Sequence, residues 1–304
     1  MSSIGLIISF FIIVAGLLWL LIQSIRGQEA DRRVIFLFMA IAVSVPLLFN
    51  ISFSEKATLI VEDVYRKIEN LPAGSKILLS YDYGPSMSPE VEPMSNAFLR
   101  HALVKGHKVY IMCLWATGQS LAATAVDSVI KREFPEKVYG IDYVNLGYKA
   151  GGTGVLNVIL TDFRKMYLAD VVGTNLDSMP MFQGIKSLKD MDLLISIGGG
   201  YPGVKEWILF ASAPGNIPLA GGCAAVSAPL LYPYYPRQMI GLLGGIKGAA
   251  EYESELKKNH PQRFANMPVP GIKMMGPQTM AHLVVLAFIV IGNISYFISK
   301  RKGQ

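Results

Sequence analysis

Residues 76–115 of this 304-residue chain read KILLSYDYGPSMSPEVEPMSNAFLRHALVKGHKVYIMCLW, and the fold class can be inferred from this stretch. Its two ends, 76–81 and 109–115, are short and almost continuously apolar, as expected of buried strands. Between them, residues 94–105 are helical in pattern and stop at Gly106, a residue that commonly ends a helix. The stretch therefore predicts two parallel strands joined by a helix.

The same alternation of strands and helices continues to residue 258. Residues 192–197, DLLISI, are the clearest of the later strands. Further strands are predicted at 143–146, 217–220 and 239–243, and further helices at 119–134, 155–167, 204–211 and 246–258. Apolar strands that alternate with helices indicate a mainly parallel sheet covered on both faces. We therefore expect residues 76–258 to form an α/β domain with a doubly wound sheet, flavodoxin-like or Rossmann-like.

Long apolar segments lie near both ends of the chain. Of all residues, 52% are hydrophobic and 16% are charged, whereas soluble domains have about 25% charged residues. Residues 4–25, 34–53 and 280–298 each match the roughly 20 apolar residues that a helix needs to cross a bilayer. We expect 1–53 to form a transmembrane hairpin, and 280–304 to form a third transmembrane helix with a basic tail. The lipid bilayer is thus the first predicted partner.

Two segments are expected to connect the spans with the domain. In residues 54–75, Ile60, Val64 and Ile68 recur on one helical face, which predicts an amphipathic connecting helix that docks against the domain. Residues 259–279 contain several prolines and glycines and little periodicity, so an irregular linker is expected there.

Basic residues near the spans indicate how the chain is oriented. They lie in the hairpin loop and in the tail, at Arg26, Arg32, Arg33, Lys300, Arg301 and Lys302. Three spans place that loop and that tail on one side of the membrane, which the positive-inside rule assigns to the cytoplasm. We therefore expect a multi-pass protein of the plasma membrane with an extracytoplasmic domain. Basic residues that lie farther from the spans, such as Lys56 and Arg66, favour the opposite orientation.

Charge and cysteine content exclude several classes of protein. The formal net charge is +6, but the basic residues form no long run and are not interleaved with aromatic residues, so nucleic acid is not an expected partner. The two cysteines, Cys113 and Cys223, are too few for a disulfide scaffold or a zinc site with thiolate ligands. A single disulfide stays open if the domain faces an oxidising compartment.

The loop after the first strand is a candidate ligand site, because ligands bind beyond the carboxyl ends of the strands in a doubly wound sheet. The loop covers residues 81–93, which is long for a connection of this kind. We assign Asp82, Ser86 and Glu90 as candidate ligand-binding residues. Its carboxylates do not by themselves define a metal site, and no metal is predicted. Alternatively, Glu90 and Glu92 only stabilise the start of the following helix.

Two glycine-rich regions follow later strands. Residues 151–154 precede a helix, but the dinucleotide and P-loop motifs are absent, so we expect a plain turn there and no cofactor. The second region pairs 198–200, GGG, with 221–225, GGCAA. Small residues around Cys223 suit a nucleophile at a sharp strand-to-helix turn. Gly199 and Gly200 could offer amide donors to an oxyanion, and with Gly222 they complete the candidate site.

The segments DLLISIGGG (192–200) and PLAGGCAAV (218–226) resemble the class I glutamine amidotransferase and DJ-1/PfpI superfamily, within residues 192–227. The resemblance implies a nucleophilic role for Cys223 and an oxyanion role for the glycine loop. The position after the cysteine is Ala224, where members of the family often have histidine, and no later His-x-Glu follows. His260 falls in the expected linker, and His101 and His107 are expected at the surface. A buried structural cysteine is the alternative interpretation.

Two functions from different classes follow from these observations. The first is a non-catalytic ligand-binding or assembly module of a membrane complex, either a homo-oligomer or a complex with another membrane protein. The second is a membrane-tethered cysteine hydrolase or amidotransferase-like enzyme built on Cys223. The first is favoured because no complete catalytic set can be named. An aromatic cluster at residues 232–236 is a candidate to close a pocket for a small molecule or to contact a partner, and simple packing is the alternative interpretation.

Overall fold

The computed structural model describes residues 15, 16, 19, 22, 23, 32–53 and 55–301. The chain divides into two compact units. One contains residues 1–53 and 272–304, and the other contains residues 54–271. Each unit is described separately below.

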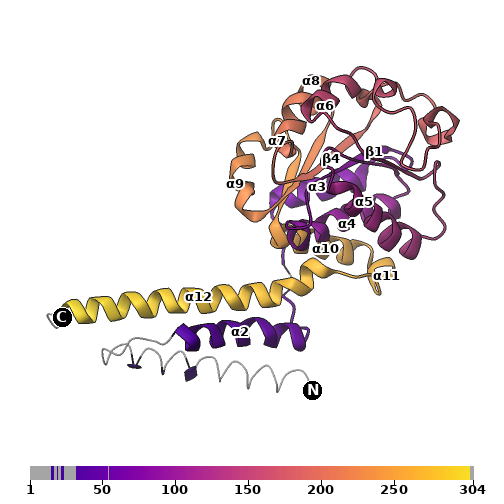
Figure 1. The fold of residues 1–304 in the computed structure, drawn as a ribbon. Coiled ribbons are helices and arrows are strands. Elements are labelled where there is room, and N and C mark those ends of the chain that lie inside the picture. Colours follow the sequence, from indigo (N-terminus) through magenta and orange to yellow (C-terminus); the bar gives the residue numbers. More distant parts are fainter. Residues whose placement is uncertain (1–14, 17–18, 20–21, 24–31, 54, 302–304) are drawn as a thin grey trace. The chain divides into compact units, whose positions relative to one another are not determined.

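The described part of the second unit contains a six-stranded parallel sheet (Figure 1). Its strands are β1 (Lys76–Asp82), β2 (Lys108–Cys113), β3 (Tyr143–Tyr148), β4 (Leu193–Gly198), β5 (Leu219–Cys223) and β6 (Gly241–Gly244). Their order is β3-β2-β1-β4-β5-β6, the order of a Rossmann-type doubly wound fold. The predicted α/β class and parallel sheet are therefore confirmed.

Helices cover both faces of the sheet (Figure 1). One face packs against α3 (Leu59–Asn70), α4 (Ser88–Val104), α5 (Gly118–Ala125) and α10 (Gly245–Asn259). The other packs against α6 (Thr153–Ile159), α7 (Val204–Trp207) and α9 (Ala228–Leu231), while the short α8 (Ala213–Gly215) has no buried residue. Successive residues of a strand point to opposite faces, so Leu219 and Cys223 of β5 lie in one hydrophobic core and Ala220 lies in the other.

Several element boundaries differ from those expected. The helix predicted over 155–167 is wrong in its second half, because α6 ends at Ile159 and short 3-10 turns follow. Asp162 explains part of this change, since its side chain accepts a hydrogen bond from the Arg164 backbone amide, at 2.9 Å, and starts a new turn. Two helices continue as π-helical segments, α5 into Val126–Lys131 and α7 into Ile208–Ser212.

The connecting helix is part of the α/β unit. α3 buries Val64 and Ile68, as its periodicity predicts, and packs against β6. The contact is close at Gly241, where a Cβ atom would lie 2.1 Å from the Ile60 carbonyl oxygen. A larger residue at that position would force the helix away from the strand.

Residues near both ends of this unit contact the same turn of α10. At the beginning of α3, the backbone amide and hydroxyl of Thr58 donate to Oε2 of Glu251, at 2.9 and 2.6 Å. At the other end, a Cβ atom on Gly271 would lie 2.9 Å from the Ala250 amide nitrogen. The chain therefore enters and leaves the unit beside residues 249–253 of α10.

The other unit contains α2 (Arg32–Leu48) and most of α12 (Pro270–Arg301). Ala42 of α2 and Val284 of α12 are buried in one small hydrophobic cluster. Among the described residues, α12 is the helix that is long and apolar enough to cross a membrane, over Pro270–Ile298. It begins ten residues earlier than the expected span, and α11 (Pro261–Phe264) also lies in the segment expected to be an irregular linker. The first expected span, 4–25, lies almost entirely outside the described residues.

Candidate functional sites

The change in strand order lies between β1 and β4, whose carboxyl ends meet at Asp82 and Gly198. β1 is followed by a connection to β2 on one side of it, whereas β4 leads to β5 on the other, so a ligand site is expected here. The two strands approach closely: a Cβ atom on Gly198 would lie 2.9 Å from the Asp82 carbonyl oxygen. Glycine is required at residue 198 for this pairing.

The Asp82 side chain points into the protein. Its carboxylate accepts hydrogen bonds from the Leu114 amide, the Ser80 hydroxyl and the Trp207 indole, each at 2.7 Å. Complete burial raises the pKa of Asp82 to about 6, and the three hydrogen bonds limit that rise. Asp82 therefore joins β1 to the end of β2 and to α7.

The glycine loop after β4 is exposed. A Cβ atom on Gly199 would meet the end of the Met87 side chain, and one on Gly200 would lie 2.5 Å from the Trp115 ring. The Trp115 indole also donates to the Pro202 carbonyl, at 2.8 Å, so it holds the loop on one side. The loop is positioned by neighbouring side chains, and its outer surface is accessible.

A cavity of about 150 Å³ lies beside this loop. Residues that follow β4 and β5 line it, namely Gly198, Gly199, Gly200, Val204, Lys205, Glu206, Ser227, Leu230 and Leu231. Lys205 is a cation, but Glu206 has a carboxylate that accepts from the Gly203 amide, at 2.9 Å. The lining is thus mixed in charge and partly apolar, which does not favour a phosphate group.

The first turn of α4 contacts the turn after β5 through Glu90. Its Oε1 atom accepts from the Ala225 backbone amide, at 2.8 Å, so the carboxylate stabilises the turn that follows Cys223. Ser86 is exposed on the loop between β1 and α4. Gly222 faces the core, where a Cβ atom would lie 2.7 Å from the Met94 sulfur. The structure thus brings Glu90 close to the glycine-rich turn, while Gly222 serves packing.

Cys223 is the last residue of β5 and is completely buried. Burial raises the pKa of its thiol to about 12, and the negative charge of Glu90 adds to this effect. Of the described non-glycine residues, Asn50 and Asn216 have positive φ angles and Cys223 does not, so the strained elbow of a nucleophile is not formed. Cys113 is also buried and free, on the opposite face of the sheet, so the two cysteines form no disulfide.

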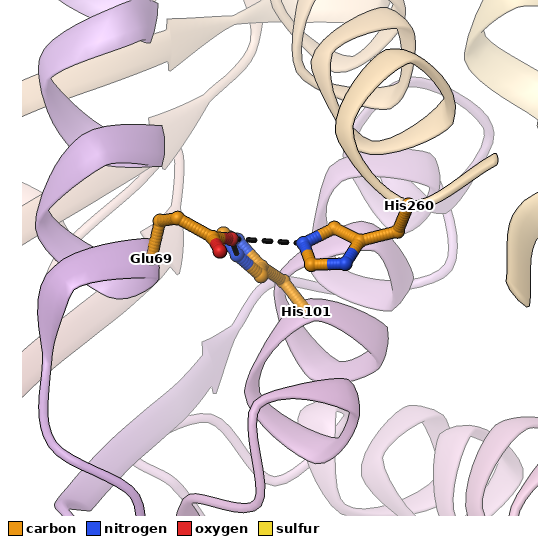
Figure 2. Close-up of side chains that lie close together, drawn as sticks. All are labelled: Glu69, His101 and His260. Atoms are coloured by element: carbon orange, nitrogen blue, oxygen red, sulfur yellow. Dashed lines mark hydrogen bonds and ion pairs between the residues drawn. The ribbon is translucent and has the colours of Figure 1, made fainter.

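The histidines of the α/β unit are found at its other edge. His101 is fully buried and His107 is 1% exposed, so the expectation that they lie at the surface was wrong. α3 and α10 cover the end of α4 and remove it from solvent. Nε2 of His107 forms a hydrogen bond with the Ile68 carbonyl oxygen, at 3.0 Å. His101 and His260 both contact Glu69, and these three residues form what we call the Glu69 cluster (Figure 2).

The Glu69 cluster is held by short polar contacts. The Nε2 atoms of His101 and His260 each lie 2.9 Å from Glu69 Oε2, and Lys105 Nζ lies 2.9 Å from Oε1. Because the carboxylate can only accept, Nε2 of His101 carries the proton, and its Nδ1 accepts from the Tyr252 hydroxyl at 2.6 Å. The His101 ring is also stacked on Tyr65, with 4.8 Å between ring centroids.

Charge and burial act in opposite directions within the cluster. The hydrogen bond from His101, followed in effect by those from Lys105 and His260, holds the pKa of Glu69 well below its usual range. Burial lowers the pKa of His101 to about 4, so its imidazole is neutral at pH 7. Residues 69 and 260 are far apart in sequence and follow no metal-binding spacing, so the sequence contained no local signal for this arrangement.

Comparisons with known proteins identify no family for this chain. No protein-family model matches the sequence, and no curated protein matches it. Among solved structures, the crystal structure of AibC is similar at a TM-score of 0.31 and 10% sequence identity. That match covers 78% of this chain and 52% of the other, so this chain spans about half the length of that protein. A likeness of this degree supports no conclusion about function.

Proposed function

We propose that this chain is a membrane-anchored, non-catalytic module that binds a protein partner through the carboxyl edge of its sheet, and that the partner is a second copy of the chain. The observation that supports this best is a contrast at that edge. Cys223 is buried with a raised pKa, whereas the loops around it present apolar side chains to solvent.

Exposed apolar residues follow both β4 and β5. Tyr201 is 69% exposed, Val226 87%, Leu230 75% and Tyr232 52%. Single exposed apolar residues are ordinary, but several on adjacent loops are typical of a surface that contacts another protein. Tyrosine is also enriched in such interfaces. We call these four residues the edge surface.

The environment of Cys223 does not favour a cysteine hydrolase. A nucleophilic thiol needs a lowered pKa or a nearby base, and Cys223 has a raised pKa. The three histidines of the α/β unit have other partners, since His101 and His260 contact Glu69 and His107 contacts Ile68. The edge therefore has features of a binding surface rather than those of an acyl-transfer site.

The membrane topology is part of the proposal. α12 supplies one helix of sufficient length, and residues 4–25 and 34–53 supply two further spans by composition. We propose a multi-pass protein of the plasma membrane in which the hairpin loop and the C-terminal tail are cytoplasmic and the α/β unit is extracytoplasmic.

The oligomeric state of the full chain in lipid nanodiscs tests this function. Light scattering is expected to give a dimer or larger assembly for the wild type and a monomer for Val226→Glu/Leu230→Glu, because two carboxylates would be buried without partners. Leu168→Glu is a matched control, since Leu168 is 72% exposed and lies outside the edge surface. A monomeric wild type would contradict the proposal, as would an assembly that tolerates the double substitution.

Alkylation of Cys223 tests the absence of catalysis independently. In a Cys113→Ala background, iodoacetamide is expected to react slowly up to about pH 9, because a buried thiol with a raised pKa forms little accessible thiolate. Rapid reaction with a midpoint below the free-thiol pKa of about 8.5 would instead favour the cysteine hydrolase.

A further inference from the structure

We propose that Glu69, His101 and His260 form a binding site for a divalent transition-metal ion, and that zinc is the ion their chemistry favours. The proposal goes beyond the edge surface, because the cluster lies at the opposite, amino edge of the sheet. Glu69 lies in the last turn of α3, the helix before β1, and His101 lies near the end of α4, the helix before β2.

The three side chains offer a set of ligands that zinc commonly uses. Two imidazole nitrogens and one carboxylate oxygen bind zinc in many proteins, with water in the remaining position. Here the three ligand atoms all lie within 4.8 Å of one another. Each Nε2 atom is 2.9 Å from Glu69 Oε2, whereas ligands about 2.0–2.1 Å from a tetrahedral zinc ion lie roughly 3.3 Å apart. The two Nε2–Oε2 distances differ from this separation by a few tenths of an ångström, whereas the two imidazole nitrogens, up to 4.8 Å apart, would have to approach each other by up to about 1.5 Å.

The burial of the cluster suits an ion that enters from solvent. The side chain of His101 is fully buried, while those of Glu69 and His260 are 26% and 19% exposed. One ligand is therefore fixed in the interior, and two lie at a surface through which an ion and a water molecule can pass. Figure 2 shows the side chains arriving from three separate segments and pointing toward one another.

Residues outside the cluster orient its ligands. The Tyr252 hydroxyl bonds to His101 Nδ1, so Nε2 is directed at Glu69. With a metal on Nε2, Nδ1 would carry the proton and donate to the same hydroxyl. A polar partner on the second ring nitrogen is a regular feature of metal-bound histidine. Tyr65 stacks on the His101 ring, and Tyr252 is itself packed edge-on against Phe98.

Helix ends add a favourable field for a cation. Glu69 lies in the last turn of α3, His101 in the last turn of α4, and His260 directly follows α10. The carboxyl end of a helix carries partial negative charge and stabilises positive charge. Lys105 also lies at the carboxyl end of α4, and its ammonium group donates a hydrogen bond to Glu69 Oε1. It leaves Oε2 for the metal, an atom that also accepts a hydrogen bond from the Tyr65 hydroxyl at 3.2 Å, and its charge weakens metal binding through repulsion.

Zinc titration of the full chain in detergent tests the site. After chelator treatment and its removal, Zn²⁺ is added in competition with a chromogenic chelator, and one ion per chain is expected to bind. His260→Ala and Glu69→Gln are each expected to weaken binding at least about 10-fold, the low end of the effect of losing even an orienting partner. Tyr252→Phe is expected to weaken it about 10-fold, because the orienting hydroxyl is lost.

His282→Ala is the matched control, since His282 is an exposed histidine of α12 outside the cluster. Lys105→Met supplies a gain-of-affinity test that does not depend on a damaged ligand set, because removal of the ammonium group is expected to tighten binding. Wild-type binding no tighter than that of His260→Ala would overturn the proposal. Binding that survives Glu69→Gln and His260→Ala but is lost in His282→Ala would also overturn it.

Discussion

Asp82 makes the stability of the α/β unit depend on pH in an unusual direction. Its pKa is about 6 in the folded chain, against an ordinary value of 3.8, because the carboxyl is buried. The folded state therefore binds more protons than the unfolded state between about pH 4 and pH 6, so this residue contributes stability at low pH that is lost as the pH rises. A difference of about 2 in pKa, at 1.36 kcal/mol for each pKa unit, corresponds to about 3 kcal/mol.

Comparison of the wild type with Asp82→Asn isolates this contribution, because asparagine keeps the shape of the side chain and does not titrate. Thermal unfolding of both full-length chains in detergent is followed at about pH 4 and pH 7. The Tm of the wild type relative to the variant is expected to fall by roughly 6–12 °C over that range, at 2–4 °C per kcal/mol. A Tm difference that stays constant, or a wild type that gains relative stability as the pH rises, would refute the reasoning.

Three further substitutions test how the fold is held together, each by thermal unfolding of the full chain. Trp207→Phe removes one of the donors to Asp82 and is expected to cost about 1–3 kcal/mol, with a larger loss at pH 7 than at pH 4, where the carboxyl is protonated. Glu133→Ala leaves Arg100, which is 5% exposed, without the carboxylate that forms a bidentate ion pair with it, and is expected to lower the free energy of unfolding by about 3–5 kcal/mol. An equal loss in Arg100→Met/Glu133→Leu would contradict this explanation. Gly118→Ala places a Cβ atom 2.1 Å from the Tyr81 carbonyl oxygen and is expected to lower the free energy of unfolding by about 1–3 kcal/mol. An unchanged Tm would show that α5 can move away from β1 at little cost.

The sequence was sufficient to predict a parallel α/β sheet but not the order of its strands. Strands such as β1 and β2 are apolar runs between turn residues, and such runs are visible in any window of the sequence. The order of the strands depends on which side of β1 the chain returns to after the long segment between β3 and β4. Local patterns do not contain that information.

Cys223 shows how a small shift in boundary changes a functional interpretation. The strand was expected to end at residue 220, which would place the cysteine in an exposed turn. β5 instead runs from Leu219 to Cys223 and pairs with β6 through that last residue. Side chains alternate along a strand, so Cys223 points into the core with Leu219. The resemblance to a cysteine elbow was thus local in sequence and did not extend to the geometry.

The Glu69 cluster could not be predicted because its residues come from different parts of the chain. Glu69 lies in the predicted connecting helix of residues 54–75, His101 is predicted at the surface, and His260 lies in the predicted linker. Each assignment was reasonable for an isolated segment. They meet because helices that alternate with parallel strands end at the same edge of the sheet, and because α3 and α10 both pack beside α4.

Residues near both ends of the α/β unit contact α10, and this has a mechanical consequence. Thr58 and Gly271, at the entry and exit of the α/β unit, both rest on the turn that includes Ala250 and Glu251. Tension applied along the two connecting segments would pass between them through a single helical turn. Part of that load would also reach the edge strand β6, because α3 and α10 both pack against it. A pull on the segment before α3 would act directly on the two hydrogen bonds from Thr58 to Glu251.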